Sequence, residues 1–305
     1  MKIATGTYFG MVGTHASQAY TALALTSFLK HTQLSNGDRF FLIDNDYTMD
    51  LPDTSSVILV RNPAPLSFAT NVNKILRMAQ EDKKNLLFVN NDIIFTPDWA
   101  SPLVSSTGAI LVPACNHSYM QYRDWRLGPM MDLDDYRGHE HDLENLSRLI
   151  RADARFKGRV VTRLHVGFYA FFLPLDISKI VGLFDERFGL GGGEDVDYRI
   201  RANLAGFDVK ITLDSFLLHF TGKSTWRGAE TPAETRIRDD RYRKYFIAKW
   251  GQDLAEIFLF SSRAQQHVEH MGLNDLLERG DYSSLIRACI ERSGGNLPCE
   301  AEKLT

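Results

Sequence analysis

The stretch that decides the interpretation of this sequence is Phe184–Asp197, FDERFGLGGGEDVD, in which three consecutive glycines run into three acids within four residues. Glycine has no Cβ, so we expect this loop to bring its backbone close to a bound ligand. The helical pattern that follows places Glu194 and Asp195 at a helix start, where the peptide N–H groups and the helix dipole favour negative charge. The simpler alternative is a glycine turn followed by an acidic N-cap, and only the rest of the chain decides between the two.

The composition is that of an ordinary globular protein of 305 residues, with 44% hydrophobic and 24% charged residues. The net charge of -3 leaves no basic excess for a polyanion, so we expect no nucleic-acid partner. The cysteines Cys115, Cys289 and Cys299 are too few for a disulfide framework, although a bridge between the last two stays open. Met1–Gly10 has no signal-peptide core, and no apolar segment is long enough to span a bilayer. We therefore expect a cytoplasmic protein without a transmembrane segment.

Apolar strand-like runs alternate with helical patterns over the first third of the chain. We expect strands at Lys2–Tyr8, Arg39–Ile43, Val57–Val60, Leu86–Val89 and Ala109–Val112. Helical patterns at 14–30 and 68–80 lie between them. Because the strands are continuously apolar rather than alternating, we predict an α/β fold with a mostly parallel sheet flanked by helices.

Polar clusters follow three of these strands, at Thr5–Thr7, Asp44–Asp46 and Asn90–Asp92. Ligands of such sheets bind beyond the carboxyl ends of the strands, so we expect all three clusters to face one crevice. The alternative is that Asp and Asn simply terminate strands, as they often do.

A metal site and a proton acceptor are the chemistry that these residues suggest. Asp92 follows one strand, and His219 lies in a later strand-like run at 216–220. One carboxylate, one imidazole and a diphosphate suit an octahedral divalent cation, either Mg²⁺ or Mn²⁺. A second carboxylate, one that does not bind the metal, would then take the proton of an attacking hydroxyl. The alternatives are a core histidine at 219 and a helix N-cap at 195.

Residues 116–163 interrupt the alternation and suggest an insertion over the crevice. The segment His139–Asp142 invites a metal interpretation, but residues two apart do not share a helix face, so we favour a solvated loop. The aromatic residues Tyr119, Tyr122 and Trp125 fit either stacking on an acceptor sugar or a local hydrophobic anchor. Helices are expected from Glu234 onward, and 291–305 suggests a frayed tail.

Six motifs in order resemble the family 2 (GT-A fold) inverting glycosyltransferases over about residues 2 to 251. They are Leu42–Asn45, Asn62–Asn73, Phe88–Trp99, Val181–Phe188 with Gly193–Arg201, His219 with Gly222, Ser224 and Thr225, and the run RYRKYFIAKWG that ends at Gly251. The resemblance implies a GT-A type, Rossmann-like sheet. It also implies a nucleoside-diphosphate sugar donor, a glycan or glycoconjugate acceptor and a role in polysaccharide biosynthesis.

The resemblance also assigns roles to individual residues. It implies contacts to the nucleoside from Thr5, Thr7 and Asp44, and support of the nucleotide pocket from Asn73. It implies that Asp92 and His219 bind the cation, and that Asp195 is the general base while Glu194 positions acceptor or loop. In this sequence Asn90 and Asn91 stand where the metal motif of the family usually has acids, on the nucleotide-sugar side of the site. Lys223 and Arg227 fit either a contact to the diphosphate or a surface role.

The domain organisation that this resemblance implies is a glycosyltransferase domain at 1–251 and a C-terminal helical extension at 252–305. The first has a nucleotide-binding half at 1–112 and an acceptor and catalytic half at 113–230. The asparagine-rich metal motif resembles rhamnosyltransferase-like members, which implies a UDP- or dTDP-sugar donor. The C-terminal helices are candidates for a homodimer interface, and the basic run at 236–244 is a candidate for peripheral contact with a membrane surface.

Two other functions remain open on the sequence. A sugar nucleotidyltransferase shares the alternating architecture, but residues 5–13 lack the Lys or Arg of a basic glycine-rich loop. A catalytically silent nucleotide- or sugar-binding module would explain Asn90 and Asn91 as a decayed metal site.

Overall fold

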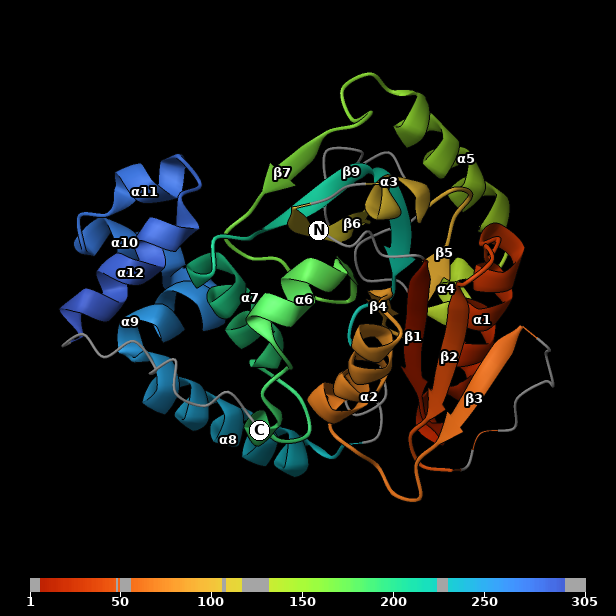
Figure 1. Cartoon of the computed structure of the whole chain (residues 1–305), viewed down its shortest axis with the longest axis horizontal. Helices are drawn as coiled ribbons and strands as arrows, with labels where there is room; N and C mark the ends of the chain where they lie inside the picture. Colours follow the sequence, from red (N-terminus) through yellow and green to blue (C-terminus); the bar gives the residue numbers. More distant parts are fainter. Residues whose placement is uncertain are drawn as a thin grey trace.

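The computed structural model describes residues 6–47, 49, 56–105, 108–116, 132–223 and 230–293. Within these residues the strands form one nine-stranded sheet in the order β3-β2-β1-β4-β8-β6-β9-β5, and β7 pairs with β9. The strands are β1 (Thr7–Gly13), β2 (Arg39–Asp44), β3 (Val57–Arg61), β4 (Asn85–Val89), β5 (Ile93–Phe95), β6 (Ala109–Cys115), β7 (Val160–Thr162), β8 (Ala170–Leu173) and β9 (Asp208–His219). Helices flank this sheet (Figure 1).

The sheet has a parallel half and a mixed half. Strands β3, β2, β1 and β4 run parallel to one another. Strand β8 is antiparallel to β4 and β6, β6 and β9 are parallel, and β5 and β7 are antiparallel to β9. The predicted α/β sheet is confirmed, and its consecutive parallel strands lie within residues 7–89.

The first strand lies later in the chain than the sequence suggested. The expected strand at Lys2–Tyr8 overlaps β1 only at its end, because β1 runs on through Gly10, where a Cβ would come within 2.6 Å of the Phe88 ring. This glycine therefore makes room for an aromatic side chain of the neighbouring β4. Strands β5 and β7 are three residues each and were not predicted.

The helices begin with α1 (Gln18–His31), α2 (Phe68–Glu81), α3 (Ser101–Val104), α4 (Leu133–Tyr136), α5 (Glu140–Ala152), α6 (Leu175–Val181) and α7 (Glu194–Leu204). They continue with α8 (Pro232–Trp250), α9 (Gln252–Leu254), α10 (Ala264–His270), α11 (Asn274–Glu278) and α12 (Tyr282–Arg292). Short turns of other helix types are η1 (His15–Ser17), η2 (Glu186–Phe188), η3 (Ala255–Leu259) and η4 (Ser261–Arg263). In the described part of the chain, no helix combines the length and apolar character needed to cross a bilayer.

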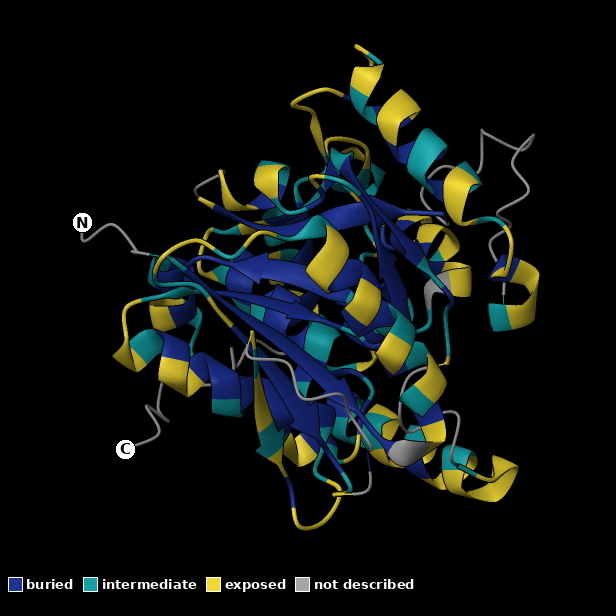
Figure 2. Cartoon of the chain, turned by 90° about the vertical axis from the view of Figure 1, so that its right-hand side faces the viewer, coloured by how far each residue is buried: buried dark blue, intermediate teal, exposed yellow. Residues whose placement is uncertain are grey.

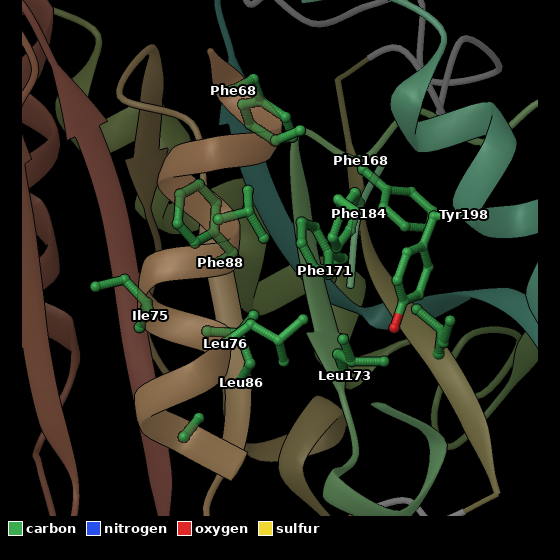
Figure 3. Close-up of a cluster of buried hydrophobic side chains, with 14 of the residues drawn as sticks. Phe68, Ile75, Leu76, Leu86, Phe88, Phe168, Phe171, Leu173, Phe184 and Tyr198 are labelled. Carbon is green, nitrogen blue, oxygen red and sulfur yellow. The ribbon is translucent and has the colours of Figure 1, made fainter. Parts of the chain in front are cut away.

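Alternation along β1 divides the core between the two faces of the sheet. Tyr8 and Val12 pack in the cluster beneath α2, α6 and α7, whereas Phe9 and Met11 pack in the cluster beneath α1 and α3. Figure 2 shows buried strands beneath helices whose outer faces are exposed. Figure 3 shows the first cluster, in which side chains of α2 meet those of β4 and β8. Each fully buried large apolar side chain contributes about 1.5–3 kcal/mol, so these two clusters hold the strand ends in register.

The helices after Gln252 share a third cluster with α7 and α8. Two hydrogen bonds join α12 to the end of α7, from Ser283 Oγ to the Asn203 carbonyl at 2.8 Å and from Arg287 to the Leu204 carbonyl at 2.9 Å. The C-terminal helices therefore rest on the helix that begins at Glu194. The domain division at 251 stays a prediction.

Candidate functional site

The carboxyl ends of the parallel strands lie level with one another. Gly13 at the end of β1 pairs with Asp44 of β2, and Asp44 pairs with Arg61 of β3. Val89 of β4 pairs with Met11, so Asn90 and Asp92 come just beyond the same edge. The polar groups that follow β2 and β4 therefore meet at one edge of the sheet, as the sequence analysis expected.

Thr7 does not belong to this edge, and its expected place at a strand end was wrong. It begins β1 rather than following it, pairs with Asn85 at the start of β4, and donates its backbone N–H to Asp38 at 2.7 Å. The reason is Gly10, which sits inside the strand rather than at its end. Thr5 lies outside the described residues. The residues that do lie at the end of β1 are Gly13 and Thr14.

Asp92 and His219 come together because β5 pairs with β9. Ile93 lies opposite His219 in this antiparallel pair, which places Asp92 beside the imidazole. Asp92 is fully buried, and its Oδ1 lies 3.4 Å from His219 Nε2. Its Oδ2 accepts a hydrogen bond from the backbone N–H of Lys223 at 3.0 Å. The exposed side chain of Lys223 does not make this contact.

The environment of His219 favours an ion pair with Asp92. Burial would lower the pKa of His219, but the bonds to Asp92 and Cys115 outweigh it and raise the pKa to about 9. The Tyr169 ring stacks on the imidazole with centroids 4.7 Å apart. Tyr169 was not predicted. The only sequence signal for it is an aromatic residue directly before the apolar run of β8, a strand whose antiparallel pairing with β4 brings it to the site.

The chemistry of this pair suits a cation. Oδ1 of Asp92 is buried and, apart from its ion-pair contact with His219, has no hydrogen-bond partner among the described residues, so this carboxylate oxygen can accept a ligand. His219 supplies an imidazole nitrogen beside it. No cluster of three or more His, Cys, Asp or Glu side chains able to hold a metal occurs in the part of the chain that the structure describes. Asp92 and His219 are thus two candidate ligands among the described residues.

The hydrogen bonds of Asn91 explain why this residue is an amide and not an acid. Its Nδ2 donates to Ser17 Oγ at 2.7 Å and to Thr21 Oγ1 at 2.8 Å. Both hydroxyls already donate their protons to carbonyl oxygens, those of Thr14 and Ser17. They can only accept, so the residue between them must be a donor. A carboxylate here would face oxygen lone pairs. Asn90, by contrast, bonds through its backbone N–H to the Tyr169 carbonyl at 2.7 Å.

A buried asparagine triad, consisting of Asn45, Asn62 and Asn71, fixes the ends of β2 and β3 against α2. Asn45 Oδ1 accepts from Asn62 Nδ2 at 2.8 Å and from Asn71 Nδ2 at 2.9 Å, and Asn62 Nδ2 also donates to Asn71 Oδ1 at 2.8 Å. Asp44 is fully buried beside it, with Oδ2 3.6 Å from Arg61 Nε. Asn45 and Asn62 lie in stretches noted in the sequence, but the sequence could not show that they bond to one another.

Asn73 holds the acidic loop in place through three hydrogen bonds of its side-chain amide. Its Oδ1 accepts from the Phe184 N–H at 2.8 Å, and its Nδ2 donates to the Phe184 carbonyl at 2.9 Å and to Glu186 Oε1 at 2.8 Å. These contacts clamp α2 to the loop at 184–186, and the expected support of a nucleotide pocket stays a prediction. The amide faces this loop because position 73 lies on the side of α2 that packs toward it.

Side chains of helix α8 pack against the glycine loop. A Cβ on Gly192 would come within 2.5 Å of the Tyr242 ring, and one on Gly189 within 3.2 Å of Arg241 Nε. Arg238 is buried and donates to the Gly191 carbonyl at 3.1 Å. Other groups do approach the loop backbone closely, as expected, and the described ones are side chains of α8. Part of the basic run at 236–244 thus serves to shape the loop.

Glu194 and Asp195 follow this loop at the start of α7. The N-cap is Gly193 and no side chain caps the helix, so Asp195 is not the N-cap. Asp195 Oδ1 accepts from the Val196 N–H at 2.8 Å. Burial raises the pKa of Asp195 against the opposing effect of the Val196 and Phe168 backbone. Burial, and then repulsion from Asp195, raise the pKa of Glu194 to about 8. Glu194 also accepts from the Gly192 N–H at 2.5 Å, which ties it to the loop.

Several expectations fall outside the described residues. They concern Tyr119, Tyr122, Trp125, Ser224, Thr225 and Arg227. In the insertion, His139 pairs with Asp142 through Nδ1 and Oδ2 at 2.8 Å. This local pair at the start of α5 accounts for that part of the histidine-acid cluster.

No family model and no curated protein matches this sequence. Among solved structures, the chain is similar to GalNAc-T7, crystallised with UDP, GalNAc and Mn²⁺, with a TM-score of 0.56 at 13% identity. That match covers 92% of this chain and 55% of the other, so the chain spans about half the length of this neighbour. It is also similar to the mannosyltransferase PcManGT from Pyrobaculum calidifontis, in complex with GDP-Man and Mn²⁺, with a TM-score of 0.49, 11% identity and coverage of 95% and 76%. The first likeness establishes the fold, which is that of the GT-A glycosyltransferases.

Proposed function

We propose that the chain is a metal-dependent glycosyltransferase that moves a hexosyl group from a nucleoside-diphosphate sugar to a hydroxyl of a glycan or glycoconjugate. The observation that supports this proposal is that two adjacent residues, Phe168 and Tyr169, contact Asp195 and His219 respectively. The backbone of Phe168 interacts with the carboxylate of Asp195, while the ring of Tyr169 stacks on His219. A proton acceptor and a cation-binding pair thus flank one dipeptide, as transfer from a diphosphate donor to a hydroxyl requires.

Asp92 and His219 are the residues that we assign to a divalent cation, Mn²⁺ or Mg²⁺. The buried, unpartnered Oδ1 of Asp92 and the adjacent imidazole support the assignment. Mn²⁺ accepts both oxygen and imidazole ligands, whereas Mg²⁺ prefers oxygen. Such a cation would neutralise the charge that develops on the departing nucleoside diphosphate.

Asp195 is the residue that we assign as the general base. The pKa of Asp195 is raised toward neutral pH. A general base is most effective when its pKa lies near the working pH. Asp195 takes the proton of the acceptor hydroxyl while that oxygen bonds to the anomeric carbon and the bond to the diphosphate breaks. One such displacement inverts the configuration of the sugar. Glu194 holds the glycine loop through Gly192 and acts as a positioning residue.

The donor nucleotide fits the edge formed by β2 and β4. We assign Asp44 and Asn90 to the nucleotide sugar and the exposed ammonium of Lys223 to its diphosphate. Asn91 contributes indirectly, by holding η1 and α1 against the end of β4. Of the UDP and dTDP donors expected from the sequence, UDP is the first to test, because the GalNAc-T7 crystals contain UDP.

A catalytically silent nucleotide-binding module is the second candidate. The observation in its favour is the structural commitment of Asn91, which leaves Asp92 as the one carboxylate of the motif Asn90–Asp92. Such a module would bind nucleotide without turning it over.

Isothermal titration tests the binding half of the proposal. UDP, dTDP and GDP are each titrated with Mn²⁺, Mg²⁺ or EDTA into the wild type, Asp92→Ala and the exposed control Asp134→Ala. We expect one nucleotide to bind in a metal-dependent way, and Asp92→Ala alone to abolish that binding. Binding of none of the three to the wild type would refute the proposal.

Turnover then separates the enzyme from the silent module. With the nucleotide sugar of the base found above, release of nucleoside diphosphate is compared between the wild type and Asp195→Asn. General-base catalysis contributes about 10²–10⁴-fold, and we expect a loss in this range with unchanged nucleotide affinity. Turnover in Asp195→Asn close to the wild-type rate would remove Asp195 as the base. Metal-dependent binding without turnover in the wild type would favour the silent module.

A further inference from the structure

A cavity lies away from the sheet edge, between the segment that follows β7 and the C-terminal helices. Its volume is about 490 Å³, within the range of roughly 300–1,000 Å³ typical of small-ligand sites. One wall is Thr162–His165, and the other is formed by α10, the end of α11 and the start of α12. Figure 1 shows these helices gathered on the α7 side of the molecule, far from β1, β2 and β3.

The charges that line this cavity are predominantly positive. Arg163 and Arg279 contribute guanidinium groups from the two walls, and Glu278 is the one carboxylate among the lining residues. Both arginines are exposed, and neither forms an ion pair with a carboxylate of the described residues. A guanidinium presents a planar set of donors that matches a carboxylate or a phosphate. Arg279 also interacts electrostatically with Asp281, and the two guanidinium groups on opposite walls of one cavity suit an anionic ligand.

The remaining lining groups suit a polyhydroxylated ligand. Thr162, Gln265 and Tyr282 add hydroxyl and amide groups, which donate and accept hydrogen bonds. Gly280 lets the two walls meet, since a Cβ there would come within 3.0 Å of Thr162 Oγ1. Thr162 and Gly280 thus bring the two walls close together at one place, and polar groups line the sides of the cavity.

The cavity is physically connected to the proposed catalytic residue. Arg199 of α7 donates through Nη1 to the Leu164 carbonyl and through Nη2 to the Arg163 carbonyl. Arg199 lies four residues after Asp195, about 6 Å along the helix axis. The segment from Arg163 to Phe168 therefore runs beside the first turns of α7, from the cavity to the residue whose backbone contacts Asp195. The cavity therefore borders the same chain segment whose Phe168 backbone interacts with Asp195.

We propose that this cavity is a subsite for an anionic sugar unit of the acceptor, one carrying a carboxylate or a phosphate, held between Arg163 and Arg279. The inference rests on the proposed function for the word acceptor, whereas the binding of an anionic sugar does not depend on it. It also gives the C-terminal helices a role in acceptor selection, because they supply one entire wall.

The test is binding of defined probes in the absence of metal and nucleotide. Trigalacturonic acid is titrated into the full chain beside its methyl-esterified form, which has the same sugar backbone without the charge, and mannose 6-phosphate forms a second arm. We expect saturable binding of at least one anionic probe and none of the neutral one. The arm that binds distinguishes a carboxylate from a phosphate.

Matched variants locate the binding. Arg163→Ala/Arg279→Ala should weaken it at least tenfold, whereas Arg148→Ala/Arg236→Ala, which removes the same charge elsewhere on the surface, should not. Glu278→Gln should tighten it, because it removes the opposing carboxylate. Equal weakening by both double variants, or saturable binding of neither anionic probe, would overturn the proposal.

Nucleotide titration of the same variants keeps the two hypotheses apart. If wild type binds UDP, dTDP or GDP with Mn²⁺ but no anionic sugar, only the subsite fails. If it binds an anionic sugar but no nucleotide, the subsite stands as a saccharide site and the proposed function fails.

Discussion

Two buried polar clusters lie at the same edge of the sheet and differ in how fully their hydrogen bonds are satisfied. In the asparagine triad, the side chains of Asn45, Asn62 and Asn71 bond to one another and to the backbone of Leu66. In the second, which we call the Asp92 cluster (Asn91, Asp92 and His219), Oδ1 of Asn91 and Oδ1 of Asp92 are buried without a hydrogen-bond partner.

The difference separates scaffold from site. An unpaired buried polar atom costs about 1–3 kcal/mol, so a folded chain retains one mainly where a ligand, an ion or water completes it. The triad needs nothing further and fixes the strand ends. The Asp92 cluster has acceptor oxygens in reserve, as a cation site requires. The sequence does not separate the two clusters, because both contain polar residues that directly follow strands.

The largest effect is expected from breaking the triad. Asn45→Ala removes an acceptor shared by Asn62, Asn71 and the Leu66 N–H, and leaves those donors buried. We expect the free energy of unfolding to fall by about 2–4 kcal/mol. Urea unfolding measures it, with the exposed Asn36→Ala as a control that should change stability by less than about 0.5 kcal/mol. A loss below about 1 kcal/mol would mean that the triad is not the scaffold at this edge.

Exchanging amide for acid tests the logic of the Asp92 cluster. Asn91→Asp replaces the donor between Ser17 and Thr21 with a carboxylate, at almost unchanged volume. We expect a loss of about 1–3 kcal/mol, since the hydroxyls already donate elsewhere. Asn90→Asp, one residue earlier and only half-buried, is the control and should be tolerated. Equal stability of the two variants would contradict the assigned role of Asn91.

The sequence predicted the elements and the edge at which they meet, but not the partners of individual side chains. Asp92 and His219 were paired in advance because each lies at a strand end of the expected sheet. Tyr169 could not be found in this way, because its position depends on β8 pairing antiparallel with β4, and strand direction is not encoded in an apolar run. Gly10 misled the assignment of β1 because its neighbour Phe88 is distant in sequence. Asn71 and Asn73 are two residues apart in one motif, yet one belongs to the triad and the other clamps the loop at 184–186.

The comparison of buried polar groups also applies to the acidic pair at the start of α7, Glu194 and Asp195, whose charge depends on pH. Glu194 has a raised pKa of about 8 in the folded chain, mainly through burial, so the folded state binds more protons than the unfolded state between about pH 4.5 and 8. Stability from this group is present at low pH and is lost as pH rises through the folded pKa, with a slope of at most about 1.4 kcal/mol per pH unit. We expect Glu194→Gln to flatten the decline, measured by urea unfolding from pH 5 to 8.5. Glu81→Gln, which removes an exposed carboxylate at the end of α2, should leave the decline unchanged, and parallel curves for wild type and Glu194→Gln would contradict the prediction.

The smallest effect is expected at Lys223, where the Asp92 cluster is held by backbone rather than side chain. The Lys223 N–H bonds Asp92 Oδ2, whereas its side chain is exposed. Lys223→Ala keeps the N–H, so stability should change by less than about 0.5 kcal/mol. If the ammonium meets the diphosphate, nucleotide affinity should fall by about 0.2–1 kcal/mol, an effect that 0.5 M salt removes by screening. The exposed Lys157→Ala is the control for both measurements. A hundredfold loss of affinity would place the ammonium inside the site, and a loss of stability above 1 kcal/mol would show that the side chain helps to build the cluster that its backbone now accounts for.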